Sequence, residues 1–361
     1  MNKKWTTKKR TTLAFTATLI LVMLLNLITS DIAISMTERR KLKPFPELTT
    51  ESLLSGDFFE DFEKYAVDQM VYRNPLRNLK ALIEYGVFQK YDNNSYFITD
   101  GHVFKMDYDK KLQEYKNAAK QIEAIYERYL TGLDVYHAII PDKNYFIRDD
   151  DKYLFNDYNA MIATINAGIT HWTYIDLFGA LTLDDYYRTD LHWKQDHLGG
   201  VMQLLESAMG FETAFDASNY THETLSPFYG AYHGGAAGLI GADHITYLTN
   251  DSIEGAVALH YSENGETTAK DVYDIDAFSG VDGYDLFLSG PTPIVEIQNP
   301  ANTSGKSLVI FRDSFASSLA PLLLEEYSTV TLVDLRYVSM DLIGEYVDFG
   351  KTVTVLFITT A

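Results

Sequence analysis

Short apolar runs that alternate with helical segments constrain the fold of this chain most. The runs lie at residues 133–140, 172–175, 307–311, 330–333 and 352–358. Segments with a helical pattern separate or follow them, at residues 157–167, 195–209, 315–326 and 340–348. A short run without polar alternation is typical of a strand that is covered on both faces. The alternation therefore predicts an α/β fold with a mainly parallel sheet and helices on both of its faces.

The chain before residue 131 has a different pattern, which suggests a separate region. Helical patterns and one hairpin pattern with an Asp-Gly turn follow each other, at residues 51–70, 75–90, 96–104 and 109–130. We expect three parts: a basic segment and apolar helix at 1–35, a linker and helical region at 36–130, and a catalytic domain at 131–361. Residues 211–300 are richer in Gly, Thr and Asn, and we expect a partly β insertion there.

The N-terminal segment has the pattern of a membrane anchor. Residues 13–29 contain no charged side chain, and five basic residues precede them: Lys3, Lys4, Lys8, Lys9 and Arg10. From Thr11 to Ile34 the segment is long enough to cross a bilayer. Since basic flanks stay in the cytoplasm, we expect a single-pass anchor in the cell membrane with an extracytoplasmic body. A cleaved signal peptide is the alternative, although Ala33–Ser35 is a poor cleavage site.

The composition excludes several functional classes. The chain has no cysteine, which removes disulfides, zinc–thiolate sites and cysteine nucleophiles. Its net charge of −20 argues against a nucleic-acid partner.

His192 and His197 lack the spacing of a helical metal pair, and Asp149–Asp151 lacks the spacing of a calcium loop. Gly230–Gly241 lacks a phosphate-loop lysine, and we expect an ordinary flexible loop there. The sequence therefore predicts neither a metal nor a cofactor.

Two short motifs carry the groups of a serine triad. In Thr189–Trp193, Asp190 and His192 are two residues apart, so in an extended segment both side chains point to the same side. In Phe311–Phe315, Ser314 follows a buried strand and precedes a helix, where ligands collect at the edge of a parallel sheet. We predict that Ser314 is the nucleophile, His192 its base and Asp190 the carboxylate that orients the base.

Other readings of these motifs stay open. Asp313 or Ser314 can serve simply as the N-cap of the helix. Asp190 can be a surface residue, and His192 a half-buried one. If the triad forms, Trp193 should pack beside the imidazole, and the Ser314 amide at the start of the helix should help to stabilise an oxyanion.

Four further residues are candidates for contacts with a substrate. They lie in or directly after predicted strands, where the carboxyl edge of the sheet should face a ligand. The candidates are Lys143, Arg312, Arg336 and Tyr337.

At these motifs the chain resembles the DHHW protein family and, more distantly, the alginate O-acetylation proteins AlgJ and AlgX. The family motif Thr-Asp-His-His-Trp corresponds to Thr189–Trp193, with Leu191 in place of the first His. Its Asp-Ser-Phe motif corresponds to Asp313–Phe315, and the segments 284–290 and 334–337 also look like the family pattern. The resemblance implies an SGNH-hydrolase-like three-layer fold with a circularly permuted motif order. Two departures are Arg312, where the wider group has Gly, and a missing Asn block.

The resemblance also implies a function. It suggests O-acetylation of an exopolysaccharide or cell-wall polymer, with a membrane-bound O-acyltransferase as a partner that passes acyl groups outward. We therefore expect an extracytoplasmic serine O-acetyltransferase with a polysaccharide acceptor. A glycan O-acetyl esterase with the same triad is one alternative. A non-catalytic polysaccharide-binding envelope protein is the other, because the 26 Tyr and 20 Phe offer faces that stack on sugars.

Overall fold

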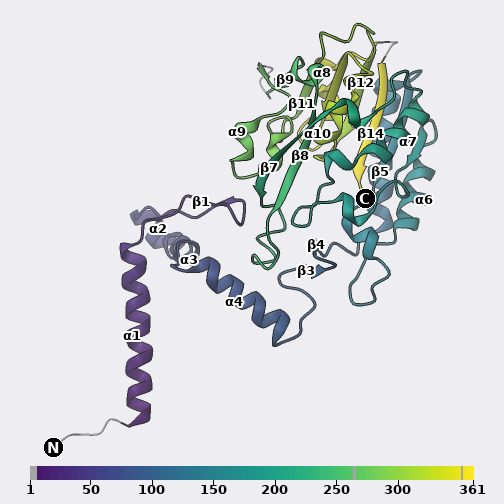
Figure 1. Cartoon of the computed structure of the whole chain (residues 1–361). Helices are drawn as coiled ribbons and strands as arrows, with labels where there is room; N and C mark the ends of the chain where they lie inside the picture. Colours follow the sequence, from purple (N-terminus) through teal and green to yellow (C-terminus); the bar gives the residue numbers. More distant parts are fainter. Residues whose placement is uncertain (1–5, 263–265, 351–352) are drawn as a thin grey trace, which may run out of the picture. The chain divides into compact units, whose positions relative to one another are not determined.

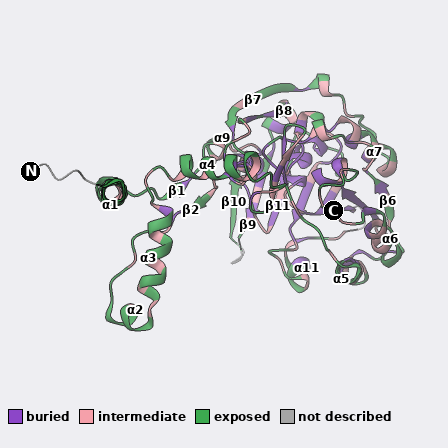
Figure 2. Ribbon diagram, turned by 90° about the horizontal axis from the view of Figure 1, so that it is seen from below, coloured by how far each residue is buried: buried purple, intermediate pink, exposed green. Residues whose placement is uncertain are grey.

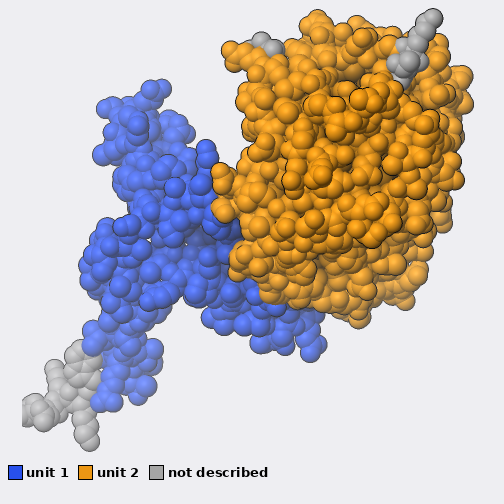
Figure 3. Space-filling view, turned by 45° about the horizontal axis from the view of Figure 1, so that its top comes forward, with its two compact units in different colours: residues 1–90, 237–239 blue, residues 91–236, 240–361 orange. Residues whose placement is uncertain are grey.

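The computed structural model describes residues 6–262, 266–350 and 353–361. Lys3 and Lys4 of the predicted basic cluster lie outside the described residues. The chain divides into two compact units, residues 1–90 with 237–239 and residues 91–236 with 240–361 (Figure 3).

The smaller unit is mostly helical. The helices are α1 (Thr7–Ile28), α2 (Thr50–Ser55), α3 (Asp57–Asp68) and α4 (Arg73–Gly86), and β1 (Ile34–Ser35) pairs with β2 (Arg40–Lys41). No side chain of α1 is buried (Figure 2). The helix has the length and hydropathy of a membrane anchor or of a signal sequence. Within this unit, a hydrogen bond from Arg40 lowers the pKa of Asp68 to about 2.

An eight-stranded sheet forms the centre of the larger unit (Figure 1). Its strand order is β10-β9-β11-β13-β12-β14-β5-β6. The five neighbouring strands from β13 to β6 are parallel, whereas β11, β9 and β10 join the sheet through antiparallel pairs. The strands are β5 (Asp134–Ile140), β6 (Thr173–Asp176), β9 (Val257–Tyr261), β10 (Thr267–Lys270), β11 (Ile294–Gln298), β12 (Ser307–Arg312), β13 (Thr329–Val333) and β14 (Val353–Thr360). The predicted α/β class with a mainly parallel sheet is confirmed.

Helices cover both faces of this sheet, which gives the three-layer arrangement. Alternate residues of β12 face opposite ways: Leu308 and Ile310 pack in one core, and Val309 and Phe311 pack in the other. The helices are α5 (Leu112–Ile125, extended by a π-turn at Tyr126–Leu130), α6 (Tyr158–Gly168), α7 (Gly199–Met209), α10 (Ala316–Leu319) and α11 (Ile343–Tyr346). The strands between the layers are largely buried (Figure 2).

Residues 211–300 contribute directly to the sheet, because β9, β10 and β11 extend it from the β13 edge. The same region contains a separate hairpin and short helical turns: β7 (Thr221–Phe228), β8 (Asp243–Thr249), α8 (Asp251–Glu254), α9 (Ile275–Phe278) and a 3-10 turn (Gly283–Leu286). The hairpin predicted at 96–104 is also present, as β3 (Tyr96–Thr99) and β4 (His102–Lys105).

The helix predicted over 315–326 is shorter than expected. The α-helical part, α10, has only four residues and continues as a 3-10 turn over Ala320–Leu323. Pro321 lies in this turn, and its ring nitrogen cannot donate the hydrogen bond that an α-helix would need. The helix dipole next to Ser314 is therefore weaker than the sequence suggested.

Candidate active site

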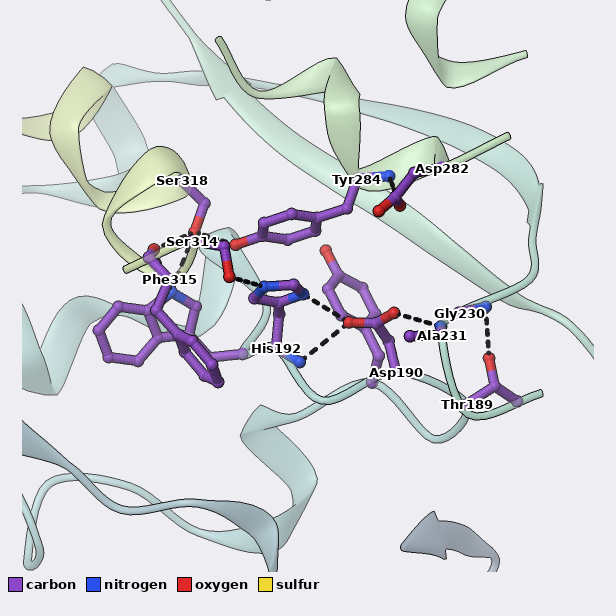
Figure 4. A network of polar contacts seen from close by, with 12 residues as sticks. Thr189, Asp190, His192, Gly230, Ala231, Asp282, Tyr284, Ser314, Phe315 and Ser318 are labelled. Carbon is purple, nitrogen blue, oxygen red and sulfur yellow. Dashed lines mark hydrogen bonds and ion pairs between the residues drawn. The ribbon is translucent and has the colours of Figure 1, made fainter. Parts of the chain in front are cut away.

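The two predicted motifs meet at the carboxyl edge of the sheet. The Nε2 atom of His192 lies 2.7 Å from the Oγ atom of Ser314, and its Nδ1 atom lies 2.6 Å from Oδ1 of Asp190 (Figure 4). Ser314 follows the end of β12, whereas Asp190 and His192 belong to a loop more than 120 residues earlier, between the 3-10 turns Leu183–Asp185 and Gln195–His197. Asp190 is fully buried and His192 is nearly so.

The contacts of Asp190 fix the tautomer of His192. Oδ1 of Asp190 accepts hydrogen bonds from the backbone N–H and from Nδ1 of His192, and Oδ2 accepts one from the backbone N–H of Ala231 at 2.6 Å. An ionised carboxylate can only accept, so Nδ1 of His192 must carry the proton. Nε2 is then free to accept the proton of the Ser314 hydroxyl, as a general base requires.

A second set of contacts holds the loop that carries Asp190. The carboxylate of Asp243 accepts from the backbone N–H and the hydroxyl of Thr189, at 2.7 and 2.6 Å, and from Nε of Arg188. Oγ1 of Thr189 in turn accepts from the N–H of Gly230. Gly230 and Ala231 are thus part of the site, whereas the sequence suggested only a flexible loop. The sequence carried no signal that would pair Asp243 with Thr189.

Asp313 has a structural role in the turn that presents Ser314. Its Oδ2 atom accepts from the N–H and the hydroxyl of Thr360, at 2.7 and 2.8 Å, and its Oδ1 atom accepts from the N–H of Phe315. These bonds tie the turn to the end of β14. The backbone N–H of Ser314 lies in the turn directly before α10, so it is the candidate donor to an oxyanion.

Trp193 packs against this turn, whereas the sequence analysis placed it beside the imidazole of His192. Its Nε1 atom donates to the carbonyl oxygen of Phe315 and to the hydroxyl of Ser318, and its ring meets Phe315 edge to face. Trp193 is fully buried. The residue after the base is therefore anchored to the helix that follows the serine, which fixes the two motifs to each other.

A cavity of about 350 Å³ opens beside Ser314. Its polar lining includes Arg312, Asp313 and Arg336, and Leu191 and Phe357 are among its apolar lining residues. The cavity lies at the carboxyl end of the central strands, where ligands of parallel sheets collect.

Lys143 is hydrogen-bonded to the backbone of the loop that carries Asp190. Its ammonium group is buried and donates to the carbonyl oxygens of Val103, Tyr187, Arg188 and Asp190, at 2.8 to 3.2 Å. Burial lowers the pKa of Lys143 to about 7. The three N–H donors of an ammonium group are all used by these carbonyls. Lys143 therefore stabilises the loop that carries Asp190. Its position after a strand did not reveal this role.

The two predicted arginines both line the Ser314 cavity, but they differ in their partners. Arg336 is paired with Asp334 through two hydrogen bonds, at 2.9 and 2.6 Å. Arg312 is only 4% exposed, and its Nη1 atom donates to the hydroxyl of Ser317 at 3.1 Å. Its Nε and Nη2 atoms have no acceptor in the part of the chain that the structure describes. Burial lowers the pKa of Arg312.

Tyr337 is not brought to Ser314. Its side chain is exposed, and its ring lies 5.6 Å from the Cζ atom of Arg336. Among the described residues, those that line the cavity beside Ser314 do not include Tyr337. Nor do the described residues contain a group of three His, Cys, Asp or Glu side chains placed to hold a metal.

The fold and the site together define an SGNH-hydrolase-like α/β protein with a hydrogen-bonded Ser–His–Asp triad. Residues 160–333 match the model of the DHHW protein family, so the predicted resemblance to that family is confirmed. No curated protein matches the chain.

Solved structures with TM-scores above 0.5 share this fold. A DHHW family protein from Eubacterium siraeum DSM 15702 is 19% identical, with a TM-score of 0.60 over 73% of this chain and 89% of that one. Bacillus cereus PatB1 is 15% identical, with a TM-score of 0.58 over 73% of this chain and 95% of that one. The O-acetyltransferase domain of Pseudomonas putida AlgJ is 14% identical, covers 72% of this chain and 88% of that one, and has a TM-score of 0.41.

Proposed function

We propose that this protein is a membrane-anchored, extracytoplasmic serine acyltransferase that moves an acetyl group onto a hydroxyl group of a polysaccharide. The observation that carries the proposal is the continuous hydrogen-bonded line from Asp190 through His192 to Ser314. A serine hydroxyl is a weak nucleophile until a base within hydrogen-bond reach takes its proton.

In the first half-reaction, Nε2 of His192 takes the Ser314 proton while Oγ attacks the carbonyl carbon of an acetyl ester. The imidazolium is stabilised by Asp190, and the oxyanion is stabilised by the backbone N–H of Ser314. When the intermediate collapses, the leaving alcohol takes the proton from Nε2, and an acetyl-Ser314 enzyme remains. In the second half-reaction, an acceptor hydroxyl gives its proton to Nε2 and attacks the acetyl group, and the proton then returns to Ser314.

Arg312 and Arg336 are the proposed substrate contacts. The charge of Arg336 is offset by Asp334, so this residue is suited to hydrogen bonding at the entrance of the cavity. The charge of Arg312 has no carboxylate hydrogen-bonded to it within the described residues, so its field favours negative charge developing near Ser314. In this account Arg312 supports the oxyanion where the wider group uses an Asn block. Lys143 and Tyr337 are not part of this proposal.

The placement of the protein rests on α1 and the basic residues before it. A helix of this length and composition fits a bilayer, and the positive flank would remain in the cytoplasm. An extracytoplasmic enzyme needs an acyl donor that reaches the outer face of the membrane. We therefore propose a membrane-bound O-acyltransferase as partner and a polysaccharide as acceptor.

Hydrolysis of glycan acetyl esters is the second candidate, because the same residues would serve it with water as the acceptor. Incubation of the full chain in detergent with an acetyl ester, with and without a de-acetylated glycan, separates the two. Transfer predicts an acetylated glycan, whereas hydrolysis predicts only acetate under both conditions. If neither product rises above the level of the Ser314→Ala variant, the result supports the non-catalytic, polysaccharide-binding alternative.

Covalent labelling provides an independent test. One structure of PatB1 contains a sulfonyl adduct, which supports the use of a sulfonyl fluoride as a probe for this fold. We expect the probe to modify Ser314 in the wild type and to leave His192→Gln largely unlabelled. Equal labelling of both proteins would contradict activation of Ser314 by His192.

A further inference from the structure

The ring of Tyr284 lies flat against the imidazole of His192. The ring centroids are 3.7 Å apart and the planes differ by only 4° (Figure 4). Phe315 meets the same imidazole at 4.8 Å, with an interplanar angle of 54°. Tyr284 comes from the 3-10 turn Gly283–Leu286, more than 90 residues after His192 in the sequence.

Hydrogen bonds fix both ends of Tyr284. Its hydroxyl group donates to Oγ of Ser318 at 2.9 Å, and its backbone N–H donates to the side chain of Asp282. Oγ of Ser318 also accepts from Nε1 of Trp193 and donates to the carbonyl oxygen of Phe315. Tyr284 is thus locked to the two residues that directly follow His192 and Ser314 in the chain.

We propose that Tyr284 is the positioning residue of His192: its ring holds the imidazole in the plane that joins Asp190 to Ser314, and its π face stabilises the imidazolium. This inference rests on the proposed acyl transfer, in which His192 becomes protonated in each half-reaction. A cation over the face of an electron-rich ring is stabilised, more so in a site from which water is excluded. The neutral imidazole gains less, so the contact favours the transition state over the ground state.

Tyr284 itself stays neutral during this chemistry. Burial raises its pKa, and Asp190 and Asp313 add to this effect while Arg312 opposes it. Tyr187, whose pKa burial also raises, interacts electrostatically with Tyr284 and Asp190. The groups that titrate or carry charge near the ring pair include Asp190, Asp313, Arg312 and Tyr187, together with Lys143, which donates to the carbonyl oxygen of Asp190, and a substitution at 284 replaces none of them.

Substitutions at 284 separate the stacking contact from the hydrogen bond. Tyr284→Phe keeps the ring and loses only the bond to Ser318, so we expect kcat to fall no more than about threefold. Tyr284→Leu removes the ring, and we expect kcat to fall about 10- to 100-fold with little change in KM. Tyr284→Met, which fills the space with a flexible side chain, should behave like the Leu variant and replaces it if that protein does not fold.

A buried tyrosine elsewhere provides the matched control. Tyr115 lies in α5, in a separate core cluster with Ile139, Tyr158 and Met161, and its hydroxyl has no partner within the described residues. Tyr115→Leu should lower the melting temperature by a similar amount but leave kcat and the pH profile unchanged. An equal loss of kcat in Tyr115→Leu and Tyr284→Leu would show that the loss comes from general destabilisation and would contradict the positioning role of Tyr284.

The second readout is the pKa of His192, measured by NMR on the full chain in detergent with labelled histidine. Loss of the π face should lower this pKa in Tyr284→Leu and Tyr284→Met, and should move the acid limb of kcat/KM to lower pH. Tyr284→Phe should keep the wild-type pKa. An unchanged pKa together with wild-type kcat in the Leu and Met variants would overturn the proposal.

The NMR measurement needs no turnover, so it distinguishes the two levels of the account. If Ser314→Ala retained full activity, the proposed function would fail, whereas the coupling between Tyr284 and His192 would still be read from the titration. If Ser314→Ala were inactive and the titration did not respond to Tyr284, only the positioning role would fail.

Discussion

Gly230 packs so closely against Asp190 that a β-carbon at position 230 would overlap with Cβ of Asp190 and with the carbonyl oxygen of Thr189. The N–H of Gly230 also donates to Oγ1 of Thr189, and the next N–H donates to the Asp190 carboxylate. The orientation of the triad carboxylate thus depends on a backbone that only glycine permits here.

Gly230→Ala should therefore displace Asp190. We expect kcat to fall at least about tenfold and the free energy of unfolding to fall by about 1–3 kcal/mol, the usual cost of overpacking. Steady-state kinetics and urea unfolding check this. Gly241→Ala is the matched control, because a β-carbon there meets nothing within 4 Å. Similar losses in both variants would contradict the role of Gly230.

Asp190→Asn should lower kcat about 10³- to 10⁴-fold with little effect on folding, because an amide cannot hold the Nδ1–H tautomer of His192 as a carboxylate does. The control is a second Asp–His pair, in which Asp185 lies 2.9 Å from Nδ1 of His197. Asp185→Asn should leave kcat within about twofold. Turnover of an acetyl ester measures kcat for both variants. A fully active Asp190→Asn enzyme would exclude Asp190 from the triad.

Asp313→Asn should loosen the turn that presents Ser314, because an amide nitrogen cannot accept the two bonds from Thr360. A buried donor left without an acceptor costs about 1–3 kcal/mol, and we expect a comparable loss of stability with a roughly tenfold loss of kcat. Thr360→Val removes only the hydroxyl donor and should give a smaller loss of both. Thermal unfolding and steady-state kinetics test whether Asp313→Asn loses more stability and more kcat than Thr360→Val. An Asp313→Asn variant as inactive as Ser314→Ala would instead indicate a catalytic carboxylate.

His260 should make the fold less stable in mild acid. Burial lowers its pKa from 6.5 to about 4, so the folded protein keeps it neutral. Below pH 6.5 the unfolded chain binds a proton that the folded chain does not, and stability therefore falls as the pH falls toward 4. At pH 5 this linkage costs about 2 kcal/mol relative to pH 7.

Urea unfolding at pH 7 and pH 5 checks this linkage. His260→Gln has no titrating group at this position, so its stability should fall less between the two pH values than that of the wild type. An equal fall in both proteins would show that His260 does not contribute.

The central sheet and the pairing of the two motifs were predictable from the sequence, since both depend on local patterns. Runs such as 307–311 are apolar on both faces, and Asp190 and His192 are close in the chain. Other features depend on contacts between distant segments. The strands of 211–300 look irregular because their partners, such as β13, come later in the sequence. Tyr284 was visible as part of a family-like segment, but nothing in the sequence placed its ring on His192.

Lys143 shows a second reason for the differences. A lysine usually stays exposed, so its position near a strand end suggested contact with a substrate. The structure buries its ammonium group, and burial of a charge is stabilised only by partners that the sequence does not identify. For Lys143 these are four backbone carbonyls, which no side-chain pattern reveals.

Turnover of an acetyl ester by Ser314→Ala, compared with the wild type in the same detergent, tests the central claim most directly. The account predicts a loss of about 10⁴- to 10⁶-fold in kcat, with the melting temperature and circular dichroism unchanged, because Ser314 and His192 act as one unit. A folded Ser314→Ala protein that turns over the ester at the wild-type rate would contradict it.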